Sequence, residues 1–169
     1  MARSYGYGDT EAVLGKFLRG RRGHVQIIVG HDQVEVRNEA LGARDAQLEV
    51  ALDDDPTSPM NSLVHAADDT HATSQVVHVA VADELVEKEG VPAPTIVKID
   101  TEGFEEDVLW GMRNTLKNVR GLMIEVHFAL LTERGHQRAP DRITSLLTDL
   151  GFRLDWVDPS HLQALRSAR

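Results

Sequence analysis

The chain has 169 residues, which suits one domain with a substantial hydrophobic core. It contains no cysteine, so disulfides and thiolate metal sites are excluded, and its net charge of −9 argues against nucleic acid as a partner. No apolar run approaches the roughly 20 residues of a membrane-spanning helix, and the first residues lack the apolar segment of a signal peptide. We therefore expect a cytoplasmic protein with neither nucleic acid nor a membrane as its partner.

The first half of the chain predicts one helix followed by a series of strands. The expected elements are a helix over residues 9–20 and strands over 24–30, 33–41, 46–52 and 75–81. Before the last of these strands, residues 53–74 are polar and rich in turn-forming residues, which makes them the longest expected loop. A short helix over residues 83–90, with Asp83 as its N-cap, is expected next.

The second half of the chain alternates strands with helices. Strands are expected over residues 95–100, 121–128 and 152–158, and helices over residues 104–116 and 140–151. The strand over 95–100 is mostly apolar, as expected where both faces of a sheet are covered. This order of elements predicts an α/β domain with a mostly parallel sheet and right-handed crossovers.

Polar residues end two consecutive strands of this predicted sheet. Lys98, Asp100 and Glu102 stand at the end of the first strand, and Glu125 and His127 stand at the end of the second. Spacing by two puts each set on one face of an extended strand, and ligands bind at the carboxyl ends of parallel strands. Carboxylates and an imidazole at one sheet edge can serve general acid–base chemistry or bind a metal ion through oxygen and nitrogen atoms.

Structural roles for these five residues stay open. Asp100 and Glu102 could only cap the following helix, and Glu125 and His127 could be solvated strand-end residues. Lys98 could form an ion pair with a neighbouring carboxylate or contact a substrate. Six other histidines lack ligand spacing and are expected at the surface: His24, His31, His65, His71, His136 and His161.

The stretch "IVKIDTEGFEEDVLWGM", residues 96–112, resembles the Lys-Ile-Asp-x-Glu-Gly-x-Glu signature of the FkbM-type methyltransferases, which use S-adenosylmethionine. Three further stretches are similar to this family in order and spacing. They are "VEVRNEALGARDAQLEVAL", "VVHVAVADELVEKEGVPAPTIVKID" and "GLMIEVHF". The resemblance runs from about residue 33 to residue 158, and the ordered set is more specific than any one stretch.

The resemblance implies a Rossmann-like, class I methyltransferase core and the transfer of a methyl group from S-adenosylmethionine to an oxygen of a small-molecule or sugar acceptor. In such folds the end of the third strand lies near the cofactor adenine, and the end of the fourth lies near the transferred methyl group. The residues that this places in the site are Asp100, Glu102 and Lys98 as catalytic residues, Glu125 and His127 at the substrate, and Glu39 and Ala40 at the cofactor.

The start of the chain departs from the family pattern. The family begins with a strand and a Gly-rich loop of the type Asp-x-Gly-Ala-Asn-x-Gly, whereas the Gly-x-Gly of this chain is in "YGYGD", which no strand can precede. We therefore expect a divergent segment over residues 1–32, formed by a helix and a strand, and an incomplete or rearranged methyltransferase-like α/β domain over residues 33–169. The missing strands would leave sheet edges open, so the strand over 24–30 or a second copy of the chain, in a homodimer, is expected to cover them.

Two other functions stay open at this stage. The missing Gly-rich loop suits a non-catalytic remnant or a partner-binding module. The residues Asp100, Glu102, Glu125 and His127 suit a metal-dependent enzyme, although the family resemblance assigns no metal ligand.

Overall fold

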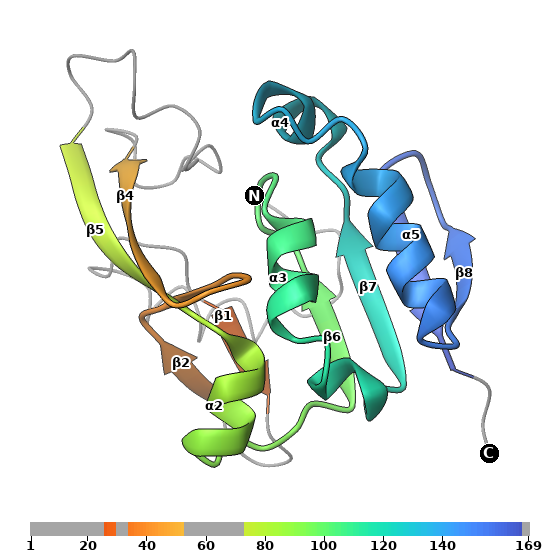
Figure 1. Ribbon diagram of the computed structural model, residues 1–169, viewed down its shortest axis with the longest axis horizontal. Coiled ribbons are helices and arrows are strands. Elements are labelled where there is room, and N and C mark those ends of the chain that lie inside the picture. Colours follow the sequence, from red (N-terminus) through yellow and green to blue (C-terminus); the bar gives the residue numbers. More distant parts are fainter. Residues whose placement is uncertain (1–25, 30–33, 53–72, 167–169) are drawn as a thin grey trace.

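The computed structural model describes residues 26–29, 34–52 and 73–166, and Figure 1 shows how their strands and helices are arranged. The helix expected over residues 9–20 lies outside the described residues, and so does most of the loop expected over residues 53–74. The described strands form three sheets of two, three and four strands. The mixed α/β architecture predicted from the sequence is therefore confirmed.

Two small sheets contain the first five strands, which are β1 (Gln26–Val29), β2 (Val34–Arg37), β3 (Ala40–Leu41), β4 (Ala46–Leu52) and β5 (Thr73–Ala80). β1 pairs with β2 in antiparallel orientation, and β5 lies between β3 and β4. β5 is parallel to β3 and antiparallel to β4. Its residues alternate, with Val77 and Val79 buried and Val76 and His78 exposed, as expected for a strand with one face on a core.

The four-stranded sheet contains β6 (Ile96–Ile99), β7 (Gly121–Glu125), β8 (Arg153–Trp156) and β9 (His161–Leu165). Its strand order is β6-β7-β9-β8. β6 is parallel to β7, whereas β9 is antiparallel to both of its neighbours. β7 and β8 therefore run in the same direction, with β9 reversed between them.

The expectation of a mostly parallel sheet is wrong, because the described sheets are mixed. The predicted strand–helix–strand–helix–strand unit does give three strands of one direction, but the sequence pattern did not predict β9. The reversal before β9 is a tight turn in which the Asp158 carboxylate accepts hydrogen bonds from the backbone N–H groups of Ser160 and His161, at 2.9 and 2.8 Å. This turn returns the chain between β7 and β8 rather than past them.

The described helices are α2 (Ala82–Lys88), α3 (Glu105–Gly111), α4 (Phe128–Glu133), α5 (Ala139–Asp149) and the short 3-10 helix η2 (Thr115–Lys117). α3 and α5 contact each other and lie side by side on one face of the four-stranded sheet (Figure 1). Between helices and sheet lies the main core, whose fully buried side chains include Leu109, Leu116, Ile124, Leu147 and Leu162. This core holds the ends of β6 and β7 in place.

Two details of the helices differ from the sequence prediction. The helix expected over residues 104–116 ends at Gly111 and continues as η2. Asp83, expected as an N-cap, lies within α2, and its carboxylate accepts hydrogen bonds from the backbone N–H groups of Asn114 and Thr115, at 2.8 and 2.7 Å. Asp83 therefore connects α2 to the start of η2, because its oxygens satisfy backbone donors that the broken helix leaves open.

β6 is less buried than its apolar sequence predicted. Ile99 is 2% exposed, but Ile96 is 66% exposed, because β6 lies at the edge of its sheet. Among the described residues β1 pairs with β2 and not with β6, so the suggestion that β1 covers this edge is wrong. A homodimer that covers the edge stays a prediction.

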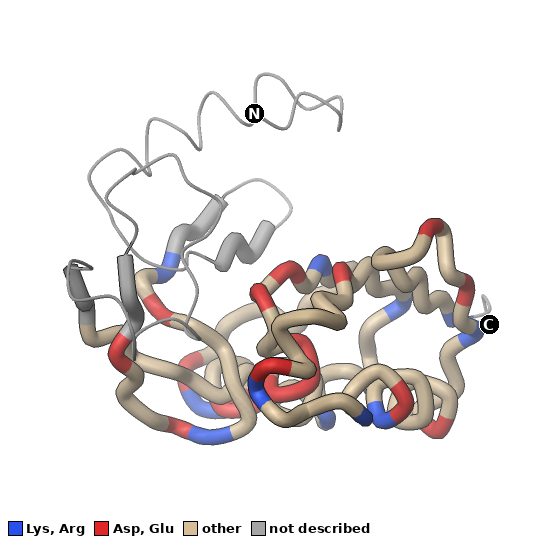
Figure 2. Tube along the Cα trace, turned by 90° about the horizontal axis from the view of Figure 1, so that it is seen from above, with Lys and Arg blue, Asp and Glu red and all other residues tan. Residues whose placement is uncertain are grey.

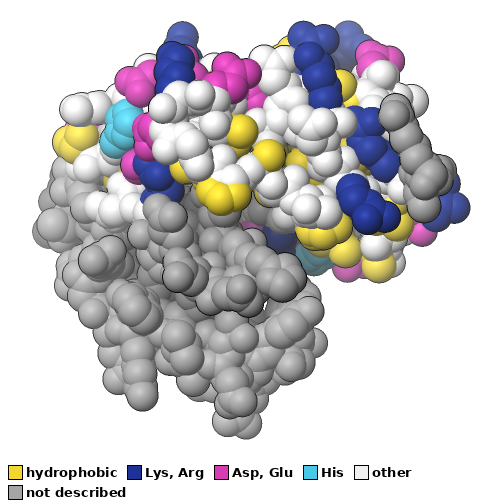
Figure 3. Space-filling model, turned by 90° about the horizontal axis from the view of Figure 1, so that it is seen from below, with side chains coloured by type: hydrophobic (Ala, Val, Ile, Leu, Met, Phe, Trp, Pro, Cys, Tyr) yellow, Lys and Arg dark blue, Asp and Glu magenta, His cyan; other side chains and the backbone are white. Residues whose placement is uncertain are grey.

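The two ends of the four-stranded sheet differ in what they present. Figure 2 looks toward the carboxyl ends of β6 and β7 and shows acidic and basic residues interspersed along the described chain. Figure 3 shows the opposite end, where Lys and Arg side chains surround hydrophobic ones.

Among the helices that the structure describes, none has the length and apolar character of a membrane span.

Candidate active site

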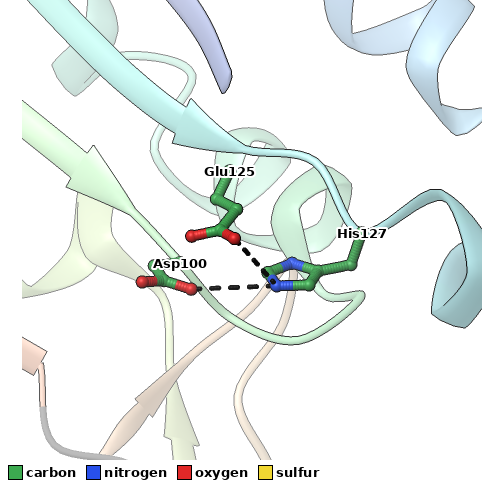
Figure 4. Close-up of side chains that lie close together, drawn as sticks. All are labelled: Asp100, Glu125 and His127. Carbon is green, nitrogen blue, oxygen red and sulfur yellow. Dashed lines mark ion pairs between the residues drawn. The ribbon is translucent and has the colours of Figure 1, made fainter. Parts of the chain in front are cut away.

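The strand ends bring side chains from two segments of the chain together. Ile99 and Ile124 are opposite each other in β6 and β7, so Asp100 and Glu125 follow as neighbours at the carboxyl end of the sheet. His127 comes two residues after Glu125, at the N-cap of α4. Figure 4 shows Asp100, Glu125 and His127 converging, with both carboxylates directed at the imidazole.

The turn between β6 and α3 has an unusual backbone. Glu102 has φ +49° and Gly103 has φ +91°, so two successive residues are left-handed. For a glutamate this conformation costs about 1–2 kcal/mol, and such residues cluster at functional sites. A Cβ atom on Gly103 would lie 2.9 Å from the Cβ of Leu130 in α4, so glycine is required there by conformation and by space.

His127 is held by a buried carboxylate that the sequence pattern did not single out. Its Nδ1 lies 2.8 Å from Oε1 of Glu105, a side chain with no exposed surface, in the first turn of α3. The same Oε1 atom accepts a hydrogen bond of 2.8 Å from the backbone N–H of Gly103. The hydrogen bond that His127 donates to Glu105 raises the pKa of His127 to about 9, against the opposing effect of burial.

The other ring nitrogen of His127 faces three carboxylates. Nε2 lies 3.4 Å from Oε2 of Glu102 and 3.9 Å from both Oδ1 of Asp100 and Oε1 of Glu125. Burial raises the pKa of Glu102, and the Asp100 and Glu125 carboxylates add to this, although His127 opposes it. The structure thus brings together all four of the acidic and imidazole residues predicted at the strand ends.

Lys98 joins this group through Asp100. Its Nζ lies 2.8 Å from Oδ2 of Asp100, on the oxygen that does not face His127. The ion pair between Lys98 and a neighbouring carboxylate, which the sequence left as one of two alternatives, is therefore present. Both side chains are partly exposed, so a substrate can still reach them.

A second histidine approaches Glu125 from β9. His161 pairs with Glu125 in the β7–β9 ladder, and its Nε2 lies 3.4 Å from Oε2 of Glu125. The Nδ1 atom lies 3.0 Å from Oδ1 of Asp158, whose pKa is lowered to about 2, chiefly by the hydrogen bond from the backbone N–H of Ser160. His161 was expected at the surface but is 19% exposed. The alternating "HLQAL" after a turn could have predicted a strand here, although not its pairing with β7.

Of the two residues expected at the cofactor, Ala40 lies in β3, in another sheet, and Glu39 directly precedes that strand. Ala40 is buried and pairs with Val79 in β5. Oε1 of Glu39 accepts a hydrogen bond of 3.1 Å from Arg37, whereas Oε2 of Glu39 is buried without a hydrogen-bond partner. The structure therefore does not place these two residues in the group around His127.

Two arginines fix the first turn of α3, from which Glu105 reaches His127. Arg142 of α5 forms a two-pronged ion pair with the buried carboxylate of Glu106, with an Nη2–Oε2 distance of 2.7 Å. Arg134 donates a hydrogen bond to the carbonyl oxygen of Gly103 and another, of 3.1 Å, to Asp107. The Arg142 pair lowers the pKa of Glu106. These contacts hold α3 against α4 and α5.

Comparisons with known proteins agree with the resemblance in the signature stretch. Residues 9–154 match the family described as the methyltransferase FkbM domain. The chain is also 36% identical to the hexuronic acid methyltransferase AglP of Haloferax volcanii over 88 residues, which are 50% of this chain and 34% of that protein. The matched part thus spans about a third of the length of this relative. No solved structure matches this chain significantly. With the match covering most of its residues, the chain belongs to the FkbM methyltransferase domain family.

Proposed function

We propose that this protein transfers a methyl group from S-adenosylmethionine to a hydroxyl oxygen of a sugar or another small molecule. The observation that carries the proposal is the group of carboxylates around His127, at the carboxyl ends of two parallel strands, in a chain of this family. The relative named as a hexuronic acid methyltransferase supports a sugar acid as the acceptor. The parallel β6–α3–β7 unit supports a Rossmann-like core.

Glu102 is the best candidate to take the proton of the acceptor hydroxyl. A general base works best when its pKa lies close to the working pH, and burial raises the pKa of Glu102 toward that range. The left-handed backbone fixes its carboxylate within 3.4 Å of His127. His127 itself is a poorer base near neutral pH, because its raised pKa keeps the ring protonated.

The neighbouring residues would bind and orient the acceptor. Asp100 can accept a hydrogen bond from an acceptor hydroxyl while Lys98 holds its other oxygen. Glu125 and His127 would flank the acceptor on the next strand. The exposed rings of Phe128 and Trp156, with centroids 5.8 Å apart, offer an apolar surface directly after His127.

The residues present allow a partial test of the cofactor. When bound, S-adenosylmethionine supplies an electrophilic methyl group on sulfur. Its nucleoside carries hydroxyl donors, and the buried, unpartnered Oε2 of Glu39 is the type of acceptor that such donors require. We propose that Glu39 and the adjacent Ala40 contribute to the nucleoside side of the site.

A binding titration and an activity assay test this function. We expect the chain to bind S-adenosylmethionine by calorimetry and to release S-adenosylhomocysteine in the presence of a hexuronic acid glycoside. Glu102→Gln should lower kcat by about 10²–10⁴-fold and leave the cofactor Kd unchanged, whereas Glu39→Ala should raise that Kd. Glu133→Gln, an exposed carboxylate on α4, is the matched control and should behave as wild type. Absence of cofactor binding at millimolar concentration would instead favour a non-catalytic, partner-binding module.

A further inference from the structure

Three side chains at the strand ends offer ligand atoms that converge on one point. Asp100, Glu125 and His127 each contribute one such atom, and the three atoms lie within 4.8 Å of one another. With Nε2 of His127 at 3.9 Å from both carboxylate oxygens, the point equidistant from all three is no more than about 2.5 Å from each. Ca²⁺ is bound at roughly 2.3–2.6 Å and smaller divalent ions at roughly 2.0–2.2 Å, so shifts of a few tenths of an ångström suffice. We propose that these three residues bind a single divalent metal ion, which takes the place of the proton on Nε2 of His127 and releases it to solvent.

Each of the three ligands is already oriented through its other polar atom. Oδ2 of Asp100 is held by Lys98 at 2.8 Å, which leaves Oδ1 toward the centre. Oε2 of Glu125 faces His161 at 3.4 Å, which leaves Oε1 toward the centre. Such outer contacts set the direction of metal ligands.

The contact between His127 and Glu105 is the most specific of these. Metal-bound histidines commonly donate their second ring N–H to a carboxylate, which fixes the ring and the tautomer. Glu105 accepts in this way from Nδ1 at 2.8 Å, and Nε2 is then directed at Asp100 and Glu125. The Glu105 side chain is fully buried, and its Oε2 has no hydrogen-bond partner. Four carboxylates face one histidine and one lysine here, so the group keeps an excess of negative charge that a divalent cation would compensate.

The ligand types select the ion. Two carboxylates suit Mg²⁺, Ca²⁺ and Mn²⁺, whereas an imidazole suits the transition metals. Mn²⁺ and Zn²⁺ both accept carboxylate together with imidazole, and Mn²⁺ is the one whose free ion is detected directly by its paramagnetism. Three protein ligands leave coordination positions open, through which the ion would polarise the acceptor oxygen. That role rests on the proposed methyl transfer, but the binding of the ion does not.

The test uses the full chain after treatment with a chelator, without S-adenosylmethionine. Mn²⁺ is titrated in, and its electron paramagnetic resonance signal reports the free ion. We expect one bound Mn²⁺ per chain for wild type and for the control Glu133→Gln. We expect at least a tenfold weaker affinity for Asp100→Asn and His127→Gln, and a 10- to 100-fold weaker one for the positioning variant Glu105→Gln. Circular dichroism establishes that each variant is folded, and partly exposed Asp100 gives a variant that does not disturb the core.

Two results would overturn the metal site. One is the absence of Mn²⁺ binding by wild type up to millimolar concentration. The other is equal affinity in wild type, Asp100→Asn and His127→Gln, which would show that the ion binds elsewhere. Methyl transfer that continues unchanged in excess chelator would remove the role of the ion in the reaction and leave the proposed function intact. Binding of Mn²⁺ by a chain that shows no methyl transfer would keep the metal site and remove the proposed function.

Discussion

Removing Arg142 should destabilise the protein through the carboxylate that it leaves behind. Glu106 has a side chain that is 8% exposed, and Arg142 covers it from α5 with a side chain that is 47% exposed. Losing one partner of a fully buried pair costs about 3–5 kcal/mol, whereas an exposed pair contributes at most about 1 kcal/mol. This pair is half-buried, and His136 lies 3.5 Å from the same carboxylate. We therefore expect Arg142→Ala to lower the free energy of unfolding by about 2 kcal/mol.

Urea unfolding at neutral pH measures this effect, and Arg138→Ala is the matched control. Arg138 precedes the same helix, but its side chain is 83% exposed and its distance to Asp141 is 4.0 Å, so its loss should change stability by less than about 0.5 kcal/mol. The Arg142 pair lowers the pKa of Glu106 below the ordinary 4.5. The pair therefore contributes its full stability above pH 4.5, and this contribution is lost as the pH falls through the lower pKa that Glu106 has in the folded protein. Equal stability of the two variants at pH 7, or a difference from wild type that persists in strong acid, would refute the reasoning.

Three further predictions concern the turn and the histidine. Gly103→Ala should lower the free energy of unfolding by about 1–3 kcal/mol more than Gly135→Ala in urea titrations, because both residues have positive φ but only a Cβ at 103 meets another side chain. Glu102→Asn should raise the melting temperature, with a gain of about 1 kcal/mol, since asparagine tolerates φ +49° and carries no charge beside other carboxylates; a lower melting temperature would mean that Glu102 has a structural role. The third prediction concerns His127 with a chelator present. Because its pKa is raised, its protonated ring stabilises the folded protein fully below pH 6.5 and loses this effect as the pH rises through about 9. The stability of wild type relative to His127→Gln should thus fall by about 3 kcal/mol over that range in urea titrations, and a constant difference would contradict the Glu105 hydrogen bond.

Local patterns in the sequence predicted the parts of the fold that depend on local rules. β4 has the expected bounds, Ala46–Leu52, because apolar and polar residues alternate along most of its length. The group at the strand ends was predicted because two rules hold for any parallel sheet. Residues two apart share one face of a strand, and the carboxyl ends of parallel strands meet at one edge. The reversed strand β9 was not predicted, because a five-residue segment after an expected last strand carries no signal of where it will pair.

Glu105 shows why the rest of the site was harder to predict. A glutamate in the first turn of a helix has an adequate local explanation in the helix dipole, so nothing in its immediate sequence calls for another. Its burial and its hydrogen bond to His127 depend on a residue 22 positions later, across the β6–β7 pair. The signature Lys-Ile-Asp-x-Glu-Gly-x-Glu did contain this residue, as its final glutamate. A family motif can therefore identify a buried hydrogen-bond partner of a site residue that the hydrophobic pattern of the sequence does not reveal.

The energetics of Glu102 and Glu105 support the proposal that these two carboxylates serve a site and do not serve stability. Glu102 has a backbone conformation that costs free energy, and its raised pKa means that folding disfavours its charged form. Glu105 is fully buried with one oxygen unpartnered, which is costly for a carboxylate. A chain that gained only stability from these positions would do better with uncharged residues. The surrounding contacts, with Lys98 on Asp100 and Arg142 on α3, hold the group in one arrangement despite that cost, as expected when binding a ligand or stabilising a transition state supplies the compensating free energy.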